Sequence, residues 1–282
     1  MQIALFHQKI TQESLIHEIQ KSHVIKAVTA KTEKTTIIDL NETLNLEQKI
    51  HLRNLGVLHE TDLGFLPKYF NPSLIKVLAM DMDSTIINIE CIDEIADAVG
   101  KKKEVSEITE AAMRGEIKDF SESLRRRVAL LEGAPESALE QVFNERLQLN
   151  EGAKELISRA HQKGIHTLLV SGGFTFFTEK LQKALHISET HANQLEIING
   201  KLTGKVIGNI VDGSAKAAYV EASCLRLGSN KHSAVTMGDG SNDLLMMHGA
   251  GLSIGYKAKP IVKDNADLAF DHVNLDAWLD LL

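Results

Sequence analysis

Residues 74–85 read LIKVLAMDMDST, a mostly apolar run that ends on Asp81, with Asp83 two positions later. A nearly continuous apolar run is what a parallel strand needs when helices cover both faces of its sheet. Similar runs occur at 165–170 and 234–237, and segments with helical patterns lie between the three. This alternation predicts an α/β protein with a doubly wound, Rossmann-like parallel sheet.

Acidic residues follow the first and third predicted strands. In parallel sheets, ligands bind beyond the carboxyl ends of the strands, so these residues should meet there. Each like-charged pair at about 4 Å costs about 4 kcal/mol when the effective dielectric constant is near 20. A hard divalent cation such as Mg²⁺, which binds carboxylates, removes that cost. Taken alone, the first acidic pair also fits a turn that caps a helix. The acids are Asp81, Asp83, Asp239 and Asp243.

The second predicted strand ends on Ser171, followed by Gly172 and Gly173. Glycines allow backbone N–H groups to approach an oxyanion, and a helix N-terminus adds positive potential. Alone, the pattern also fits a tight turn. Lys216 lies near the start of a predicted helix, where a cation opposes the helix dipole. This lysine is therefore either simply exposed or directed at an anion.

Two further regions flank the predicted strands. Residues 92–149 show helical patterns throughout, which predicts an inserted cap of about four helices over the strand ends, where a lid belongs. Residues 1–72 predict a small α+β domain in the order β-α-β-β-α, with a linker at 63–72 that contains glycine and two prolines. The candidate site residues described above therefore all fall in a core domain at 73–282.

The 282 residues carry a net charge of −7, which argues against a nucleic-acid partner and leaves a small anionic substrate possible. We expect the two cysteines to be reduced thiols. No window approaches the roughly 20 apolar residues of a membrane helix, and the N-terminus does not fit a signal peptide. These patterns predict a cytoplasmic protein that does not bind membranes.

The motifs at 81–85, 171–174, Lys216 and 238–243 together resemble the four ordered motifs of the haloacid dehalogenase (HAD) superfamily of phosphatases. From about residue 76 to the end, the chain most resembles the phosphoserine phosphatases of that superfamily. The resemblance covers about three quarters of the chain. It implies Mg²⁺-dependent hydrolysis of O-phospho-L-serine to L-serine and phosphate, the last step of serine biosynthesis.

The resemblance also implies a role for each motif residue. Asp81 is the expected nucleophile that forms an aspartyl-phosphate, and Asp83 is the expected general acid and base. Mg²⁺ is expected on the Asp81 carboxylate, the Asp83 backbone carbonyl and the Asp239 carboxylate, with Asp243 orienting that shell. The residues expected to hold the phosphoryl group are Ser171, Gly172, Lys216 and Asn242.

The cap is expected to supply substrate specificity. Glu90 suits the substrate ammonium, and Arg127 suits its carboxylate because a guanidinium binds carboxylates through two parallel hydrogen bonds. Both assignments follow the family pattern; from spacing alone, a solvated helix face is the better interpretation. Met113 and Phe120 are expected to close the apolar side of the pocket, although core packing is the ordinary role of such residues.

Other functions stay open at this point. One is a phosphatase or phosphotransferase that acts on a different small phosphomonoester. Another is a sensor role for the N-terminal region, which resembles in outline small amino-acid-binding (ACT-like) domains. That region is also a candidate surface for a homodimer.

Overall fold

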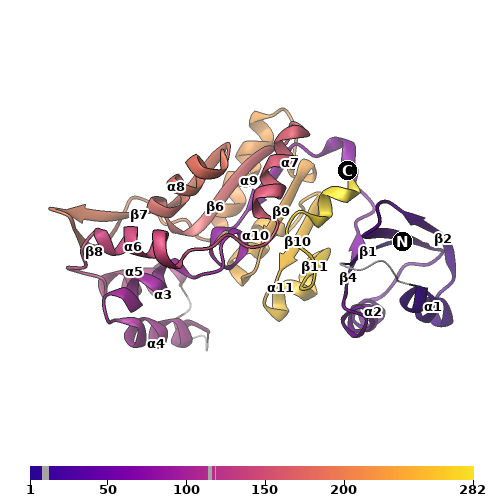
Figure 1. Ribbon diagram of the computed structural model, residues 1–282, viewed down its shortest axis with the longest axis horizontal. Helices are drawn as coiled ribbons and strands as arrows, with labels where there is room; N and C mark the ends of the chain where they lie inside the picture. Colours follow the sequence, from indigo (N-terminus) through magenta and orange to yellow (C-terminus); the bar gives the residue numbers. More distant parts are fainter. Residues whose placement is uncertain (8–12, 114–115, 118) are drawn as a thin grey trace.

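Three parts follow one another across the molecule, with the sheet core in the middle, the cap at one end and the N-terminal domain at the other (Figure 1). The computed structural model describes residues 1–7, 13–113, 116–117 and 119–282, without the side chain of Met113. Among these residues, no helix has the length and apolar character needed to cross a membrane.

The core sheet has seven strands in the order β11-β10-β9-β5-β6-β7-β8. Every neighbouring pair is parallel except β7 and β8, which form an antiparallel hairpin. The predicted α/β fold class is therefore confirmed. The strands are β5 (Val77–Met80), β6 (His166–Phe174), β7 (Glu189–Ile198), β8 (Lys201–Ile207), β9 (Ala234–Gly238), β10 (Leu252–Tyr256) and β11 (Leu268–Phe270).

Helices cover both faces of this sheet, which explains the unbroken apolar run of β5. Val77 and Ala79 belong to one apolar cluster, together with Val220. Leu78 and Met80 belong to a second, larger cluster on the other face. Successive side chains of a strand point to opposite faces, so β5 needs apolar residues at every position. The core helices are α7 (Ala153–Gln162), α8 (Thr175–Leu185), α9 (Gly213–Arg226), α10 (Leu244–Met247) and α11 (Pro260–Asn265).

The cap contains four α-helices in its described residues, followed by one wide helical turn at Val142–Arg146. The β7–β8 hairpin, which the sequence analysis missed, extends from the core to the cap (Figure 1). Gly133 N–H donates to Leu202 C=O at 2.8 Å, and Leu202 N–H donates to Ala134 C=O at 2.9 Å. The hairpin therefore ties the cap to the sheet. The cap helices are α3 (Cys91–Ala98), α4 (Lys102–Met113), α5 (Phe120–Ala129) and α6 (Ser137–Gln141).

The N-terminal domain is a four-stranded antiparallel sheet in the order β2-β3-β1-β4. The predicted linker at 63–72 is wrong in its first half, because β4 extends to Leu66. Gly64 looked like a turn residue, but it allows close approach instead: a Cβ there would lie 2.2 Å from Leu268 of β11. The elements are β1 (Gln2–His7), α1 (Glu13–Ser22), β2 (Ile25–Ala30), β3 (Thr35–Leu40), α2 (Leu46–Leu58) and β4 (Thr61–Leu66).

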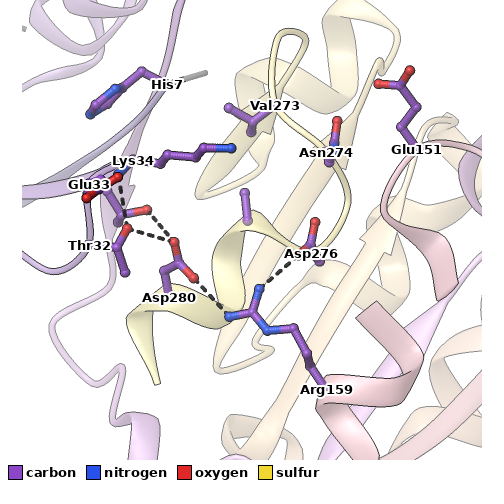
Figure 2. Close-up of a pocket in the computed structure, with 12 residues that line it drawn as sticks. His7, Thr32, Glu33, Lys34, Glu151, Arg159, Val273, Asn274, Asp276 and Asp280 are labelled. Atoms are coloured by element: carbon purple, nitrogen blue, oxygen red, sulfur yellow. Dashed lines mark hydrogen bonds and ion pairs between the residues drawn. The ribbon is translucent and has the colours of Figure 1, made fainter. Parts of the chain in front are cut away.

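Polar contacts fix the N-terminal domain to the core. Figure 2 shows one set, around a cavity of about 670 Å³ between the two. The Asp280 carboxylate accepts hydrogen bonds from Thr32 at 2.9 Å and from Thr35 at 3.1 Å, and it pairs with Arg159 at 2.9 Å. A second set lies at Asp62, whose carboxylate accepts the backbone N–H groups of residues 271–273. The two domains are therefore joined at several separate points.

Candidate active site

Lys216 lies between two carboxylates at the end of β5. Its Nζ is 2.8 Å from Asp81 Oδ1 and 2.8 Å from Asp243 Oδ1. All three side chains are buried, and Lys216 has no exposed surface. The N-cap of α9 is Asp212, whose carboxylate accepts Ala215 N–H, so Lys216 is on the first turn. The sequence analysis left two alternatives for Lys216, an exposed side chain or one directed at an anion, and its burial excludes the first.

Three carboxylates gather around this lysine. Asp81, Asp239 and Asp243 each offer an oxygen within 4.8 Å of the others, and all three residues are buried. Asp243 has both oxygens engaged, because Oδ1 binds Lys216 and Oδ2 accepts Gly240 N–H at 3.1 Å. Asp81 and Asp239 are therefore the better placed of the three to bind a metal ion directly.

The charge balance of this cluster is unfavourable without a further cation. Burial, and then the charge of Asp243, raise the pKa of Asp81 well above its ordinary value. The same two causes raise the pKa of Asp239 to about 7. The pKa of Lys216 is also raised, because the attraction of Asp243 and Asp81 outweighs burial. One lysine cannot neutralise three buried carboxylates, so the cluster suits a divalent metal.

Asp83 lies in the loop that leaves β5. One of its oxygens accepts Cys91 N–H at 3.3 Å. Burial, and then the charge of Glu90, raise the pKa of Asp83 to about 7. Its neighbour Ser84 has a φ of 55°, which is uncommon outside glycine, and donates a hydrogen bond to Glu90 at 2.7 Å. A carboxyl group with a pKa near 7 can both give and take a proton at neutral pH.

The Ser171 motif lies opposite Asp83. As the sequence predicted, the motif opens a helix, because Phe174 is the N-cap of α8, which begins at Thr175. β6 itself continues to Phe174 across a bulge. Gly173 lies close to the acidic loop, since a Cβ there would be 2.8 Å from Asp83 Oδ2. Any side chain at this position would displace Asp83. Glycine is therefore required at position 173 because the backbone approaches Asp83 so closely.

A cavity of about 430 Å³ lies between the core and the cap. It brings together most of the predicted residues, while Lys216 and Asp243 are buried beneath it. Met113 ends α4, but its side chain lies outside the described residues, so its predicted role cannot be placed. The predicted residues that line the cavity are Asp81, Asp83, Glu90, Phe120, Arg127, Ser171, Gly172, Asp239 and Asn242.

Arg127 differs from its two arginine neighbours. It is partly buried and lines the cavity, whereas Arg125 and Arg126 are exposed and do not line it. Burial lowers the pKa of Arg127, and the charges of Asp93 and Glu90 oppose that effect. The described residues give its guanidinium no carboxylate ion pair. Arg127 is therefore a cation that faces the cavity.

Sequence reasoning missed three residues that bear on this site. Lys259 lines the cavity near Asp239, and Pro260, at the first position of α11, was an available signal for a helix start. Asp93 also lines the cavity, facing Arg127. Asn193 is buried and donates to Gly172 C=O at 2.8 Å, while its own oxygen accepts Val211 N–H. No local pattern marks Asn193, because its partners come from other parts of the chain.

The parallel sheet, the carboxylates at its strand ends and the buried lysine define a hydrolase of the haloacid dehalogenase class. The family described as haloacid dehalogenase-like hydrolase matches residues 78–248, and the chain belongs to this family and, within it, to the phosphoserine phosphatases.

Several similar proteins and solved structures are described as phosphoserine phosphatases. A phosphoserine phosphatase from Polaromonas sp. is 50% identical over 211 residues, which cover 73% of this chain and 89% of that protein. The unliganded structure of a probable phosphoserine phosphatase from Vibrio cholerae has a TM-score of 0.81 at 33% identity, covering 100% of this chain and 85% of the other. A phospho-aspartyl intermediate analogue of phosphoserine phosphatase has a TM-score of 0.68 at 38% identity, covering 74% and 99%.

Proposed function

We propose that this protein hydrolyses O-phospho-L-serine to L-serine and phosphate, as the last step of serine biosynthesis. The observation that carries the proposal is that Asp81, Asp83, Glu90 and Arg127 all line one cavity. The relatives named phosphoserine phosphatase support the same substrate.

Asp81 is the proposed nucleophile. Its carboxylate attacks phosphorus, and the serine oxygen leaves, so the phosphoryl group becomes bonded to Asp81. Lys216, 2.8 Å from Asp81 Oδ1, offsets the repulsion between this carboxylate and the phosphate. The similarity to a structure described as a phospho-aspartyl intermediate analogue supports this covalent step.

Asp83 is the proposed acid and base. With a pKa of about 7, it protonates the leaving serine oxygen and then removes a proton from the water that attacks the phosphoryl group. Ser171, Gly172 and Asn242 are proposed to hold the phosphoryl oxygens, since all three line the cavity.

Mg²⁺ is the proposed cofactor. Asp81, the backbone carbonyl of Asp83 and Asp239 would bind it, while Asp243, whose oxygens are both engaged, orients Lys216 and the loop at Gly240. The fit rests on the three buried carboxylates, which one lysine cannot neutralise. When bound, Mg²⁺ supplies positive charge that stabilises the negative charge of the transition state.

Substrate choice is proposed to rest on Arg127 and Glu90, which would pair with the carboxylate and the ammonium of the amino acid. Phe120, which lines the same cavity, would cover the apolar part of the substrate. Met113 stays a proposed member of the pocket from the family pattern alone. A buried site must pair both charges of an amino acid, because an unpaired buried charge is costly.

The experiment that tests this proposal compares two adjacent arginines. Arg127→Ala should lower kcat/KM for O-phosphoserine by about 100-fold, because a charge-assisted pair contributes about 1.5–3 kcal/mol or more, yet barely change hydrolysis of an aryl phosphate. Arg126→Ala is the matched control: it removes an exposed arginine of the same helix and should change neither rate. If Arg127→Ala lowered the rate equally on both substrates, Arg127 would not be the residue that binds the substrate carboxylate.

We also propose that the enzyme is located in the cytoplasm and forms a homodimer through its N-terminal domain. Both cysteines are free and buried, which suits a reducing compartment. β2 is an edge strand with five exposed residues, and an open edge can pair with a second copy. Light scattering of the purified chain would decide between monomer and dimer.

A further inference from the structure

Arg53 of α2 reaches from the N-terminal domain to the core. Its two terminal nitrogens donate to the backbone carbonyls of Lys263 and Ala266, the latter at 2.6 Å. The guanidinium also lies over the Phe65 ring, 5.4 Å from the centroid. Burial lowers the pKa of Arg53, while Asp264 and Asp267 oppose that effect. An arginine held in this way by two carbonyls and a ring has a defined position.

The two carbonyls belong to the C-terminal end of α11. The last carbonyls of a helix have no partner within the helix, and a cation near them is favourable. α11 has only six residues, so its own hydrogen bonds give it little stability. In Figure 1, α11 lies on the side of the core that faces α2. Arg53 therefore supplies a partner that this short helix lacks.

The other end of α11 is bonded to the candidate active site. Lys259 N–H, at the N-cap of α11, donates to the backbone carbonyl of Asp239 at 2.9 Å. Val262 N–H donates to Lys259 C=O at 2.9 Å, and Ala266 N–H donates to Val262 C=O at 2.8 Å. With the bond from Arg53 to Ala266, four consecutive hydrogen bonds connect the N-terminal domain to Asp239.

We propose that Arg53 is a positioning residue that holds α11, and through it the Asp239 backbone, in the geometry that the metal site needs. This inference rests on the proposed metal-binding role of Asp239. The N-terminal domain thereby supports the catalytic core, in addition to any binding function of its own. Arg53 lies outside the candidate active site, so its loss should weaken the site rather than abolish it.

The remaining interdomain contacts allow this role to be separated from domain docking. Thr32 and Thr35 bind Asp280, which lies outside α11 and lines the other cavity (Figure 2). Removing both hydroxyls weakens docking without removing any bond to α11. Lys49 offers a second control, because its Nζ lies over the same Phe65 ring at 5.3 Å.

The test uses the full chain and two readouts that need no turnover. In Arg53→Ala, calorimetry should show a Mg²⁺ dissociation constant raised by about twofold to thirtyfold, the range of coupling carried through packed networks. Hydrogen exchange should be faster across 259–266, including the Lys259 amide. Lys49→Ala and the double variant Thr32→Val, Thr35→Val should match the unmodified protein in both readouts.

Several outcomes would overturn the proposal. They are unchanged Mg²⁺ affinity and exchange in Arg53→Ala, or equal changes in the threonine double variant, which would indicate docking alone. Should Arg53→Ala fail to fold, Arg53→Lys replaces it, since a lysine cannot bond both carbonyls in the same planar geometry and should give a smaller loss. Should the unmodified protein bind no Mg²⁺, the proposed metal site fails, and the exchange data still decide whether Arg53 holds α11.

Discussion

Replacing Lys216 by methionine should destabilise the protein strongly, and by an amount that depends on pH. The substitution keeps a side chain of similar length but leaves Asp81 and Asp243 buried without their shared cation. Removing one partner of a buried ion pair costs about 3–5 kcal/mol. The cost has a ceiling, because one carboxyl can take up a proton instead.

The ceiling follows from the ordinary carboxyl pKa of 3.8. Holding such a group protonated costs about 1.36 kcal/mol for each unit by which the pH exceeds its ordinary pKa. The cost is therefore about 4.4 kcal/mol at pH 7 and about 1.6 kcal/mol at pH 5. A carboxyl whose folded pKa is raised stabilises the fold at low pH and loses that contribution as pH rises. The deficit of Lys216→Met should therefore shrink from about 4 kcal/mol at pH 7 to about 1.6 kcal/mol at pH 5.

Urea unfolding in the presence of EDTA measures this deficit, and added Mg²⁺ should reduce it. Lys180→Met is the matched control, because Lys180 pairs with Glu140 at 2.9 Å on the surface, where such pairs contribute about 0–1 kcal/mol. A deficit below about 1 kcal/mol at pH 7, or a deficit that stays the same when the pH is lowered from 7 to 5, would refute the conclusion that Lys216 neutralises two buried carboxylates.

Two further predictions concern other parts of the molecule. Gly173→Ala should lower kcat on the order of 100-fold, because its Cβ would lie 2.8 Å from Asp83 Oδ2 and displace that group; near-normal kcat for phosphoserine would contradict this. Glu189→Gln should lower Tm at neutral pH, since hydrogen bonds from His191 and His166 outweigh burial and lower the pKa of Glu189 to about 2. A depressed pKa stabilises the fold above the unfolded value of 4.5, so the Tm difference should vanish as pH falls toward 2; calorimetry at several pH values checks this.

The core was predictable because its signals are local. The apolar run of β5 needs both faces covered, and the acids after β5 and β9 had to meet at one sheet edge. The β7–β8 hairpin was missed although Asn199 and Gly200, both with positive φ, are the residues that such turns prefer. β4 was missed for a different reason, since Gly64 is explained by its contact with Leu268, which is distant in sequence.

Some site residues could also be predicted from local sequence, and others could not. Asp81, Asp83 and Asp239 could be grouped from strand ends alone, but the burial of Lys216 between two carboxylates depends on the packing of α9 against the sheet. Arg127 could be separated from Arg126 only by the family pattern, because helix spacing does not show which arginine faces the cavity. Lys259 and Arg53 act across long sequence separations, so no local pattern predicts their contacts.

The central claim is that Asp81 carries the phosphoryl group during turnover, and chemical trapping tests it most directly. The protein is mixed with Mg²⁺ and O-phosphoserine, quenched in acid and reduced with borohydride, which converts an acyl phosphate to an alcohol. Peptide mass spectrometry should then find homoserine in place of Asp81, only when substrate is present and not at Asp83 or Asp239. A protein that turns over substrate under the same conditions but gives no trapped product, or gives it at another residue, would contradict the claim.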